Sequence, residues 1–284
     1  MKPINLQIKD LINDKEKLTF LVGAGCSIDS PSCLPAGRAM MNAIIDYACP
    51  KSEINKIKNM EQLRFEALVE IVRDTLDNDL KLIDYYGLCE KPNIQHFFFA
   101  EMIKKGHFVM TTNFDFLLEH ALIQSGVPKD EIIVAITKED FVNYQNPVEL
   151  YENNKKTLYK IHGSTQNIFT EKSTKDSLVA TIQAFGSNKQ GLNMFQIESF
   201  KQNLFKNITK DRSLVIIGYS GSDDFDIIPT LKELKNLNNV IWIDFKMDDE
   251  SQEQIFKIDK STPDKDKVNQ VLIELKQTNN AKHV

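Results

Sequence analysis

The strings TTNFD at residues 111–115 and KIHGS at residues 160–164 decide the fold class of this chain. Each string follows a run of apolar residues that is typical of a buried β-strand. Each therefore places polar groups at the carboxyl end of a strand, where open α/β sheets bind their ligands. The first string offers the amide of Asn113 and the carboxylate of Asp115, and the second offers the imidazole of His162.

Two turns of small residues flank these strings along the chain. GAGCS at residues 23–27 follows the apolar run FLV, and GYSGSD at residues 218–223 follows VII. Glycine lets the backbone pass close to a phosphate, to which the amides of the turn can donate hydrogen bonds. Such turns also form for packing reasons, and the sequence leaves both explanations open. Four polar turns at four strand ends nevertheless favour a nucleotide pocket, although GAGCS is not the G-x-G-x-x-G fingerprint of dehydrogenases.

Strand and helix patterns alternate along the chain, which predicts an α/β fold: a Rossmann-like, doubly wound parallel sheet with helices on both faces. No strand pattern occurs between residues 23 and 106, so we expect a helical insertion at about residues 36–95 within a single domain spanning residues 1–284. The expected strands are 18–22, 107–112, 132–136, 158–161, 178–182, 214–217 and 240–243. The expected helices are 4–16, 38–48, 61–86 (one long helix or a pair), 96–103, 115–124, 195–208, 226–234 and 268–275.

Composition and charge narrow the functional classes. The 284 residues are 42% hydrophobic and 26% charged, with a formal net charge of −5, which disfavours a nucleic-acid-binding surface. No apolar run approaches the roughly 18 residues of a membrane span. The N-terminus lacks the basic and then apolar pattern of a signal peptide. We therefore expect a cytoplasmic protein with no direct nucleic-acid binding and no membrane contact.

The cysteines predict that no structural zinc is bound. Cys26, Cys33, Cys49 and Cys89 all precede residue 90, and no two have the C-x-x-C spacing of a zinc site. Cys26 lies in the first glycine turn, with no base beside it in the sequence. A small residue that fills a tight corner is therefore favoured over a catalytic thiol.

The polar residues at the strand ends also have structural explanations. Asn113 and Asp115 are residue types that the start of a helix prefers, as cap and first-turn acid. Asp244 follows an apolar strand, where it could accept a hydrogen bond from a ribose hydroxyl or be an ordinary surface carboxylate. His162 precedes a glycine at an exposed strand end, which favours a base acting near neutral pH over a structural role. For His96, at an expected helix start, capping or core packing is favoured.

Taken in order, the four strings resemble the motifs of the sirtuin family over roughly residues 16–246. Thr111 and Thr112 stand where the family has Thr and Gln in its T-Q-N-x-D motif. The family's G-A-G-x-S, N-x-D, H-G and G-x-S motifs are matched, respectively, by Gly23, Ala24, Gly25 and Ser27, by Asn113 and Asp115, by His162 and Gly163, and by Gly218 and Ser220.

The chain departs from classical protein deacylases of this family in two places. LPAGR at residues 34–38 keeps the Pro and the Arg of the family's G-I-P-D-F-R motif but lacks its Asp and Phe. The two C-x-x-C zinc pairs that follow the H-G motif in those deacylases are missing. With these departures, the chain resembles the zinc-less sirtuin-like domains that degrade NAD in bacterial anti-phage defence.

The resemblance implies an NAD+ hydrolase with NAD as substrate and no metal. It assigns Asn113 to hold the ribose or a water, Asp115 to support the loop and His162 to act as general base. The NAD-binding residues that it implies are Gly23, Ala24, Gly25, Ser27, Arg38, Thr112, Gly218, Ser220 and Asp244. The alternatives are a non-catalytic sensor of NAD or ADP-ribose and, less favoured, an NAD-dependent protein deacylase.

The resemblance also implies partners. Sirtuin-like defence domains are often fused to, or paired with, a sensor or regulatory module. We therefore expect a homo-oligomer that works with such a module, and the sequence is compatible with the N-terminal part of a larger protein.

Overall fold

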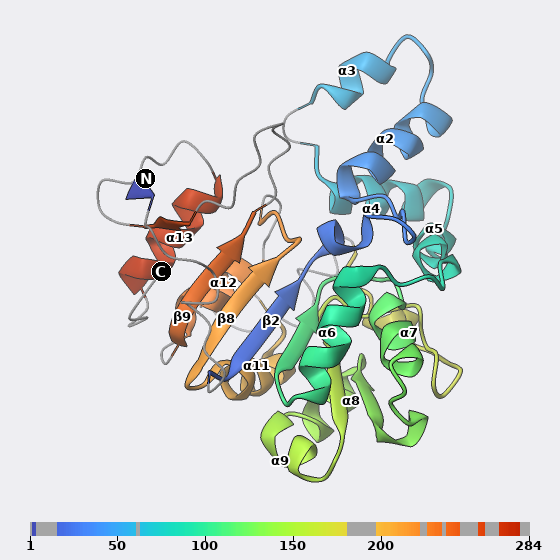
Figure 1. The fold of residues 1–284 in the computed structure, drawn as a ribbon. Helices are drawn as coiled ribbons and strands as arrows, with labels where there is room; N and C mark the ends of the chain where they lie inside the picture. Colours follow the sequence, from blue (N-terminus) through green and yellow to red (C-terminus); the bar gives the residue numbers. More distant parts are fainter. Residues whose placement is uncertain are drawn as a thin grey trace.

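A six-stranded parallel sheet forms the centre of the molecule (Figure 1). The computed structural model describes residues 2–3, 16–60, 63–180, 197–221, 226–234, 237–244, 255–258 and 267–278. The sheet has the order β4-β5-β3-β2-β8-β9, and each neighbouring pair is parallel. Its strands are β2 (Leu18–Val22), β3 (Phe108–Thr111), β4 (Ile132–Ala135), β5 (Lys156–Lys160), β8 (Arg212–Ile217) and β9 (Leu237–Ile243). The predicted α/β fold with a parallel sheet is confirmed.

Both faces of the sheet are covered by helices, which explains why the central strands are continuous apolar runs. Alternate residues of a strand point to opposite faces, and Leu21 and Phe20 accordingly belong to two different buried clusters. Leu21 packs with residues of α11 (Gln202–Thr209), α12 (Ile227–Glu233) and α13 (Lys267–Thr278). Phe20 packs with residues of α6 (Ile94–Lys104) and α7 (Leu117–Gln124), which lie on the other face (Figure 1).

The chain between β2 and β3 contains the predicted helical insertion. It comprises α2 (Gly37–Ala48), α3 (Ile54–Lys58), α4 (Phe65–Thr75), α5 (Lys81–Asp84) and the 3₁₀ turn η2 (Tyr85–Leu88). Met41, Ile45 and Leu68 are among the buried residues of its own core. Of the two possibilities for residues 61–86, the structure forms a helix pair. The break is at Leu80, whose φ of 52° is left-handed, and Leu82 N donates to Asp77 Oδ2 at 2.8 Å.

The later elements differ from the prediction at several points. The prediction of a strand at residues 178–182 is wrong for residues 178–180, the part that the structure describes. These residues form no strand, because Val179 N donates its hydrogen bond to the carbonyl of His162. The helix expected at 195–208 begins later, at Gln202, after the 3₁₀ turn η5 (Ser199–Lys201). The helix expected at 4–16 lies almost wholly outside the described residues. The elements that the sequence pattern missed are the short helices α8 (Lys138–Asn143) and α9 (Pro147–Glu152) and the hairpin of β6 (Gln166–Asn167) and β7 (Lys172–Ser173).

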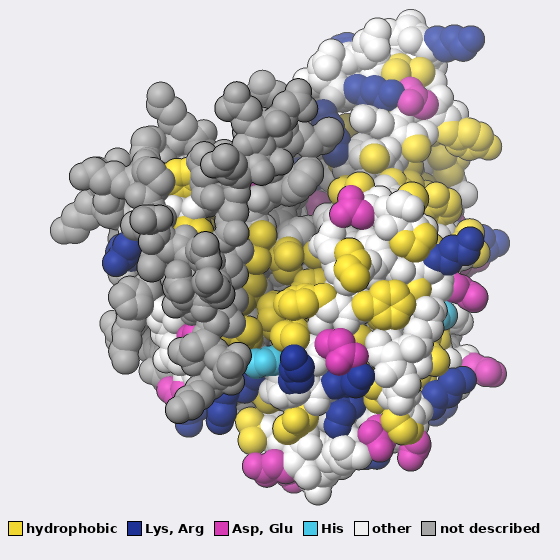
Figure 2. All heavy atoms as spheres, viewed as in Figure 1, with side chains coloured by type: hydrophobic (Ala, Val, Ile, Leu, Met, Phe, Trp, Pro, Cys, Tyr) yellow, Lys and Arg dark blue, Asp and Glu magenta, His cyan; other side chains and the backbone are white. Residues whose placement is uncertain are grey.

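The remaining short elements lie at the ends and in the turns. β1 (Lys2–Pro3) pairs with β10 (Phe256–Lys257), and 3₁₀ turns are η1 (Ala24–Ser27), η3 (Lys129–Glu131) and η4 (Lys175–Ser177). Figure 2 shows basic and acidic side chains interspersed over one face. In the part of the chain that the structure describes, no helix has the length and apolar character to cross a membrane.

The order of the strands places a switch point beside β2. β2 pairs with β3 on one side and with β8 on the other. The chain continues from β2 toward β3 and β5 on one side, and later returns to add β8 and β9 on the other side, so the direction of winding changes between β2 and β8. Open α/β sheets bind ligands in the crevice outside the carboxyl ends of the strands at such a point. The turns that follow β2 and β8 therefore lie where a ligand is expected.

Candidate functional site

The two glycine turns meet at the switch point. Gly23 N donates to Ile217 O at 3.0 Å, and Gly25 N donates to Gly218 O at 2.8 Å. A Cβ on Gly23 would lie 2.5 Å from Gly218 O, and Gly218 itself has a φ of +66°. These glycines thus allow two backbones to touch. The backbone amides of Gly23 and Gly25 donate their hydrogen bonds to carbonyls at the end of β8 and in the turn that follows it. These contacts support the packing explanation that the sequence left open.

Cys26 fills the corner between these turns. Its side chain is fully buried, and Sγ lies 3.7 Å from Ile217 O. Burial raises the pKa of the Cys26 thiol to about 12, and the nearby carboxylates of Asp115 and Asp29 act in the same direction. Because the thiolate is the nucleophilic form, this environment supports packing rather than catalysis.

Asn113 has one buried polar atom that no group among the described residues satisfies. Its Nδ2 donates to Gly23 O and to Ser27 Oγ, both at 3.3 Å. A carbonyl oxygen only accepts, so the contact with Gly23 fixes which way the amide faces. Oδ1 of Asn113 is buried and has no hydrogen-bond partner in the part of the chain that the structure describes. An unmatched buried acceptor costs about 1–3 kcal/mol, and a hydroxyl of a ligand or a water would satisfy it.

Asp115 lies behind Asn113 and is joined to it through Ser27. Ser27 Oγ donates to Asp115 Oδ2 at 2.8 Å, and Leu117 N donates to Asp115 Oδ1 at 3.1 Å. The second contact satisfies a backbone amide at the start of α7, but Asp115 precedes this helix and is not the first-turn acid that the sequence suggested. Asn113 does not cap this helix, because α7 begins at Leu117 and Phe116 occupies the cap position without a side-chain bond.

His162 follows β5 and faces a buried carboxylate. Nε2 of His162 lies 3.3 Å from Oδ1 of Asp226, and the two side chains are 14% and 3% exposed. Asp226 stands at the start of α12. Sequence reasoning missed this residue, and the only available signal was the acid-rich run DDFD at residues 223–226.

The strand register makes the loops of Asn113 and His162 neighbours. Thr111 of β3 pairs with Lys160 of β5, so Asn113 and His162 each stand two residues beyond paired positions on adjacent strands. Adjacent strands lie about 4.8 Å apart. Gly163 completes the turn with a φ of +79°, and a Cβ there would meet Ser177 O at 2.2 Å.

A buried lysine, which sequence reasoning also missed, connects these two loops. Lys160 is fully buried, and its Nζ donates to Asp115 O and, at 3.0 Å, to Glu119 Oε1. Nζ also lies 4.8 Å from the centroid of the Phe116 ring. Burial raises the pKa of Glu119, while the Lys160 cation acts against that rise. The signal in the sequence was a lysine inside the apolar strand TLYKI.

The other predicted site residues are less closely joined. Thr112 is half-buried, and its N donates to Val22 O at 3.1 Å. Ser220 and Asp244 are exposed beyond the carboxyl ends of β8 and β9. Arg38 is exposed on α2, and its guanidinium donates to Lys58 O at 2.7 Å within the insertion. The structure thus brings Gly23, Ser27, Asn113 and Asp115 into one network, and a shared pocket with Ser220, Asp244 and Arg38 stays a prediction.

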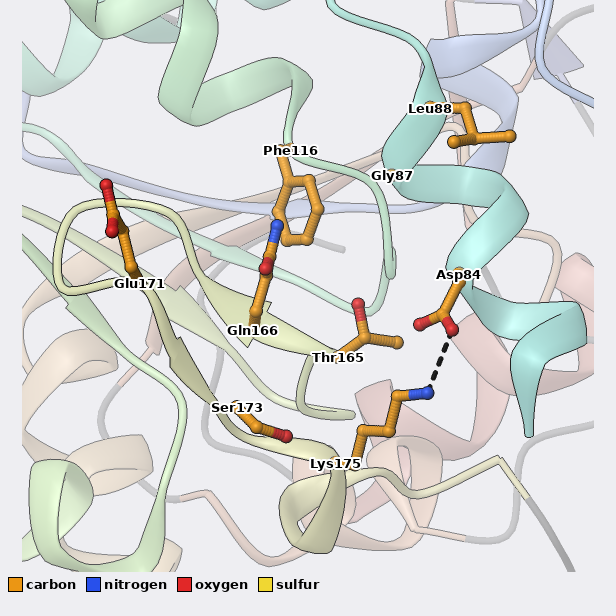
Figure 3. Close-up of a pocket in the computed structure, with 9 residues that line it drawn as sticks. All are labelled: Asp84, Gly87, Leu88, Phe116, Thr165, Gln166, Glu171, Ser173 and Lys175. Carbon is orange, nitrogen blue, oxygen red and sulfur yellow. Dashed lines mark hydrogen bonds and ion pairs between the residues drawn. The ribbon is translucent and has the colours of Figure 1, made fainter. Parts of the chain in front are cut away.

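A pocket of about 420 Å³ is lined by Phe116 and by none of the predicted site residues (Figure 3). Lys175 and Asp84 form an ion pair of 2.8 Å across it. Its lining residues are Asp84, Gly87, Leu88, Phe116, Thr165, Gln166, Glu171, Ser173 and Lys175. Phe116 and Thr165 follow the Asn113 and His162 motifs, so this pocket adjoins both loops.

The described residues contain no group of three or more His, Cys, Asp or Glu side chains that could hold a metal ion. All four cysteines are free thiols. The absence of a structural zinc stays a prediction.

The fold is that of a Rossmann-like α/β protein, and its strand-end motifs lie at the switch point of the sheet. The family model of the SIR2-like domain matches residues 107–263, which is more than half of the chain. The chain therefore belongs to the SIR2-like domain family, and the sirtuin-like resemblance is confirmed at this level. The matched span includes Asn113, His162 and Gly218, and family membership fits an NAD-dependent activity. No curated protein matches the chain.

Proposed function

We propose that this chain is an NAD+ hydrolase that releases nicotinamide and ADP-ribose. The observation that carries the proposal is the pairing of His162 with the buried carboxylate of Asp226, one strand away from Asn113. A base held by a third group is the arrangement expected for proton transfer in catalysis. The unmatched Oδ1 of Asn113 fits a ribose hydroxyl or a water.

These residues suit the chemistry of glycosidic cleavage. The bond between ribose C1′ and the nicotinamide nitrogen breaks with its electron pair going to nicotinamide, which removes that ring's positive charge. A water oxygen then forms the new bond to C1′. His162 accepts the proton that the water loses, either directly or through a ribose hydroxyl, and Asp226 stabilises the imidazolium that results. Asn113 holds the hydroxyl or the water in place.

The wider role that we propose rests on the resemblance to sirtuin-like defence domains. In this role the protein is a cytoplasmic anti-phage effector of the zinc-less branch that depletes NAD+ when it is activated. A homo-oligomer and a fused or separate regulatory module would keep it silent in an uninfected cell, since unregulated loss of NAD+ would harm the host. NAD+ is the substrate in this proposal, and no metal takes part in its cleavage.

The test is to incubate the purified chain with NAD+, with and without an acylated peptide, and to separate the products by chromatography. Under activating conditions, such as an assembled oligomer or the full-length partner, we expect nicotinamide and ADP-ribose in equal amounts, independent of the peptide. His162→Ala should lower the rate by about 10²–10⁴-fold, and Asn113→Ala should also impair it severely. His120→Ala, on α7, is the matched control and should keep the wild-type rate.

The other two functions give different results in this assay. NAD+ or ADP-ribose binding without turnover, also in the assembled oligomer, would identify a sensor. Turnover that requires the acylated peptide would identify a protein deacylase. Full activity of His162→Ala would show that His162 is not the general base.

A further inference from the structure

His96 is buried beside the Asn113 network, and the hydrogen bonds around its ring fix the position of its proton. It is 1% exposed and lies in the first turn of α6. Asn93 N donates to Nδ1 of His96 at 3.1 Å, so Nδ1 carries no proton. The proton of the neutral ring is therefore on Nε2, which lies 3.3 Å from Ser27 Oγ. Burial lowers the pKa of His96, which favours this neutral form.

The Ser27 hydroxyl uses all of its hydrogen-bonding capacity in this arrangement. It donates to Asp115 Oδ2 at 2.8 Å and accepts from Nδ2 of Asn113 at 3.3 Å. The Nε2 proton of His96 supplies the second bond that it accepts. A hydroxyl has one proton and two lone pairs, so each bond sets the direction of the other two. Without the donor from His96, the hydroxyl would be free to turn away from Asp115 or Asn113.

The start of α6 is also tied to the first glycine turn. Asn93 Oδ1 accepts from Gln95 N at 3.0 Å, and Asn93 Nδ2 donates to Cys26 O at 2.8 Å. The helix start, the turn after β2 and the loop after β3 thus form one hydrogen-bonded unit. His96 is the side chain of α6 that reaches Ser27 within it.

We propose that His96 is a positioning residue that acts through Ser27 to hold Asn113 and Asp115 in the arrangement that the reaction uses. This proposal rests on the proposed NAD+ hydrolase activity. It adds a residue of α6 that supports the reaction without touching the substrate. The competing explanation is that His96 only caps α6. The two explanations use different ring atoms, because capping needs Nδ1 and positioning needs Nε2.

Two substitutions separate these atoms. In His96→Asn the amide oxygen can replace Nδ1 toward Asn93 N, but the side chain is too short to reach Ser27. In His96→Gln the longer amide can place a donor near the position of Nε2. We expect His96→Asn to lower kcat by about 10- to 100-fold with little change in KM, because small displacements of positioning groups have effects of that size. His96→Gln should restore most of kcat, and both variants should lose no more than about 2–4 °C in Tm.

His107 provides the matched control. Its Nδ1 also accepts a backbone hydrogen bond, from Leu18 N at 3.2 Å, at the opposite end of the sheet. His107→Asn should change Tm by a similar amount and leave kcat unchanged. The Ser27→Ala background tests whether His96 acts through Ser27. In that background His96→Asn should have no further effect on kcat, because the Ser27 hydroxyl is already absent.

The position of Asn113 can be followed without turnover. The side-chain amide signals of Asn113 in an NMR spectrum of the wild-type chain should shift in His96→Asn and return in His96→Gln, and the affinity for ADP-ribose by calorimetry should follow them. A wild-type protein that cleaves no NAD+ under activating conditions would refute the proposed function, while these two readouts would still test the positioning role. The positioning role would be overturned if His96→Asn kept the wild-type amide signals and affinity, or if its effect persisted in Ser27→Ala.

Discussion

Asp226 Oδ1 lies 3.3 Å from His162 Nε2, although the two residues are 64 positions apart in the sequence. The pair forms because the carboxyl end of β5 and the start of α12 lie together at the same edge of the sheet. A carboxylate that is 3% exposed can hold the imidazole in one orientation and stabilise its charged form.

Asp226→Asn should therefore lower NAD+ cleavage while leaving NAD+ binding largely intact. The amide keeps the shape but removes the negative charge that stabilises the protonated ring. We expect a rate between that of wild type and that of His162→Ala, measured as kcat under activating conditions. Asp176→Asn, at an exposed site, is the control. A wild-type kcat in Asp226→Asn would show that the pair has no catalytic role.

The contact between the glycine turns can be tested with a pair of alanine substitutions. Gly218 and Gly126 both have positive φ, of +66° and +80°. A Cβ on Gly218 would lie 2.6 Å from Cys26 N, whereas nothing lies within 4 Å of one on Gly126. Gly126→Ala should cost about 1–2 kcal/mol of backbone strain.

Gly218→Ala should lower the free energy of unfolding by more than Gly126→Ala, because the clash with Cys26 adds to the same backbone strain. The measurement is the free energy of unfolding in urea for both variants. Equal losses would mean that the two turns can separate easily, and the packing explanation for the glycines would then fail.

The buried His96 and the half-buried His107 predict how stability depends on pH. Burial lowers the pKa of both His96 and His107 from the ordinary value of 6.5, and the Arg212 and Lys105 cations contribute at His107. Below pH 6.5 the unfolded chain binds protons that the folded chain does not, so the free energy of unfolding should fall as pH falls. The slope is at most about 1.4 kcal/mol per pH unit for each histidine.

Unfolding in urea between pH 7.5 and 5.5 measures this effect. The double variant His96→Asn/His107→Asn should have a flatter pH dependence than the wild type over this range. An unchanged slope would show that these rings do not resist protonation in the folded protein.

The sequence was sufficient for the six strands of the sheet and for the motifs at their carboxyl ends, because buried parallel strands are apolar runs. The same apolar signal wrongly predicted a strand at residues 178–182, of which residues 178–180 are described. It did not predict α8, which is only six residues long and is fixed by a capping box between Thr137 and Asp140 rather than by apolar periodicity. Nor did it predict the partners of the motif residues. Asp226 and Lys160 act through contacts with residues far away in the sequence, and such contacts leave no local pattern.

The buried Lys160 and Glu119 pair should be important for stability and for the geometry of the site. Lys160→Met leaves the Glu119 carboxylate, which is 3% exposed, without its cation, and leaves Asp115 O without its donor. Breaking one side of a buried pair typically costs about 3–5 kcal/mol, whereas replacing both partners by apolar residues costs less. We therefore expect a large loss in Lys160→Met and a partial recovery in Lys160→Met/Glu119→Leu.

Lys56→Met is the control, since Lys56 pairs with Glu53 at 3.8 Å on an exposed helix surface. It should change the free energy of unfolding by no more than about 0.5 kcal/mol. Urea unfolding at pH 7 compares the three variants. The double variant should regain stability but not activity, because the loop that carries Asn113 would still lack the bond from Lys160 to Asp115 O. Recovery of both together would mean that Lys160 contributes only to folding and does not hold the Asn113 loop beside His162.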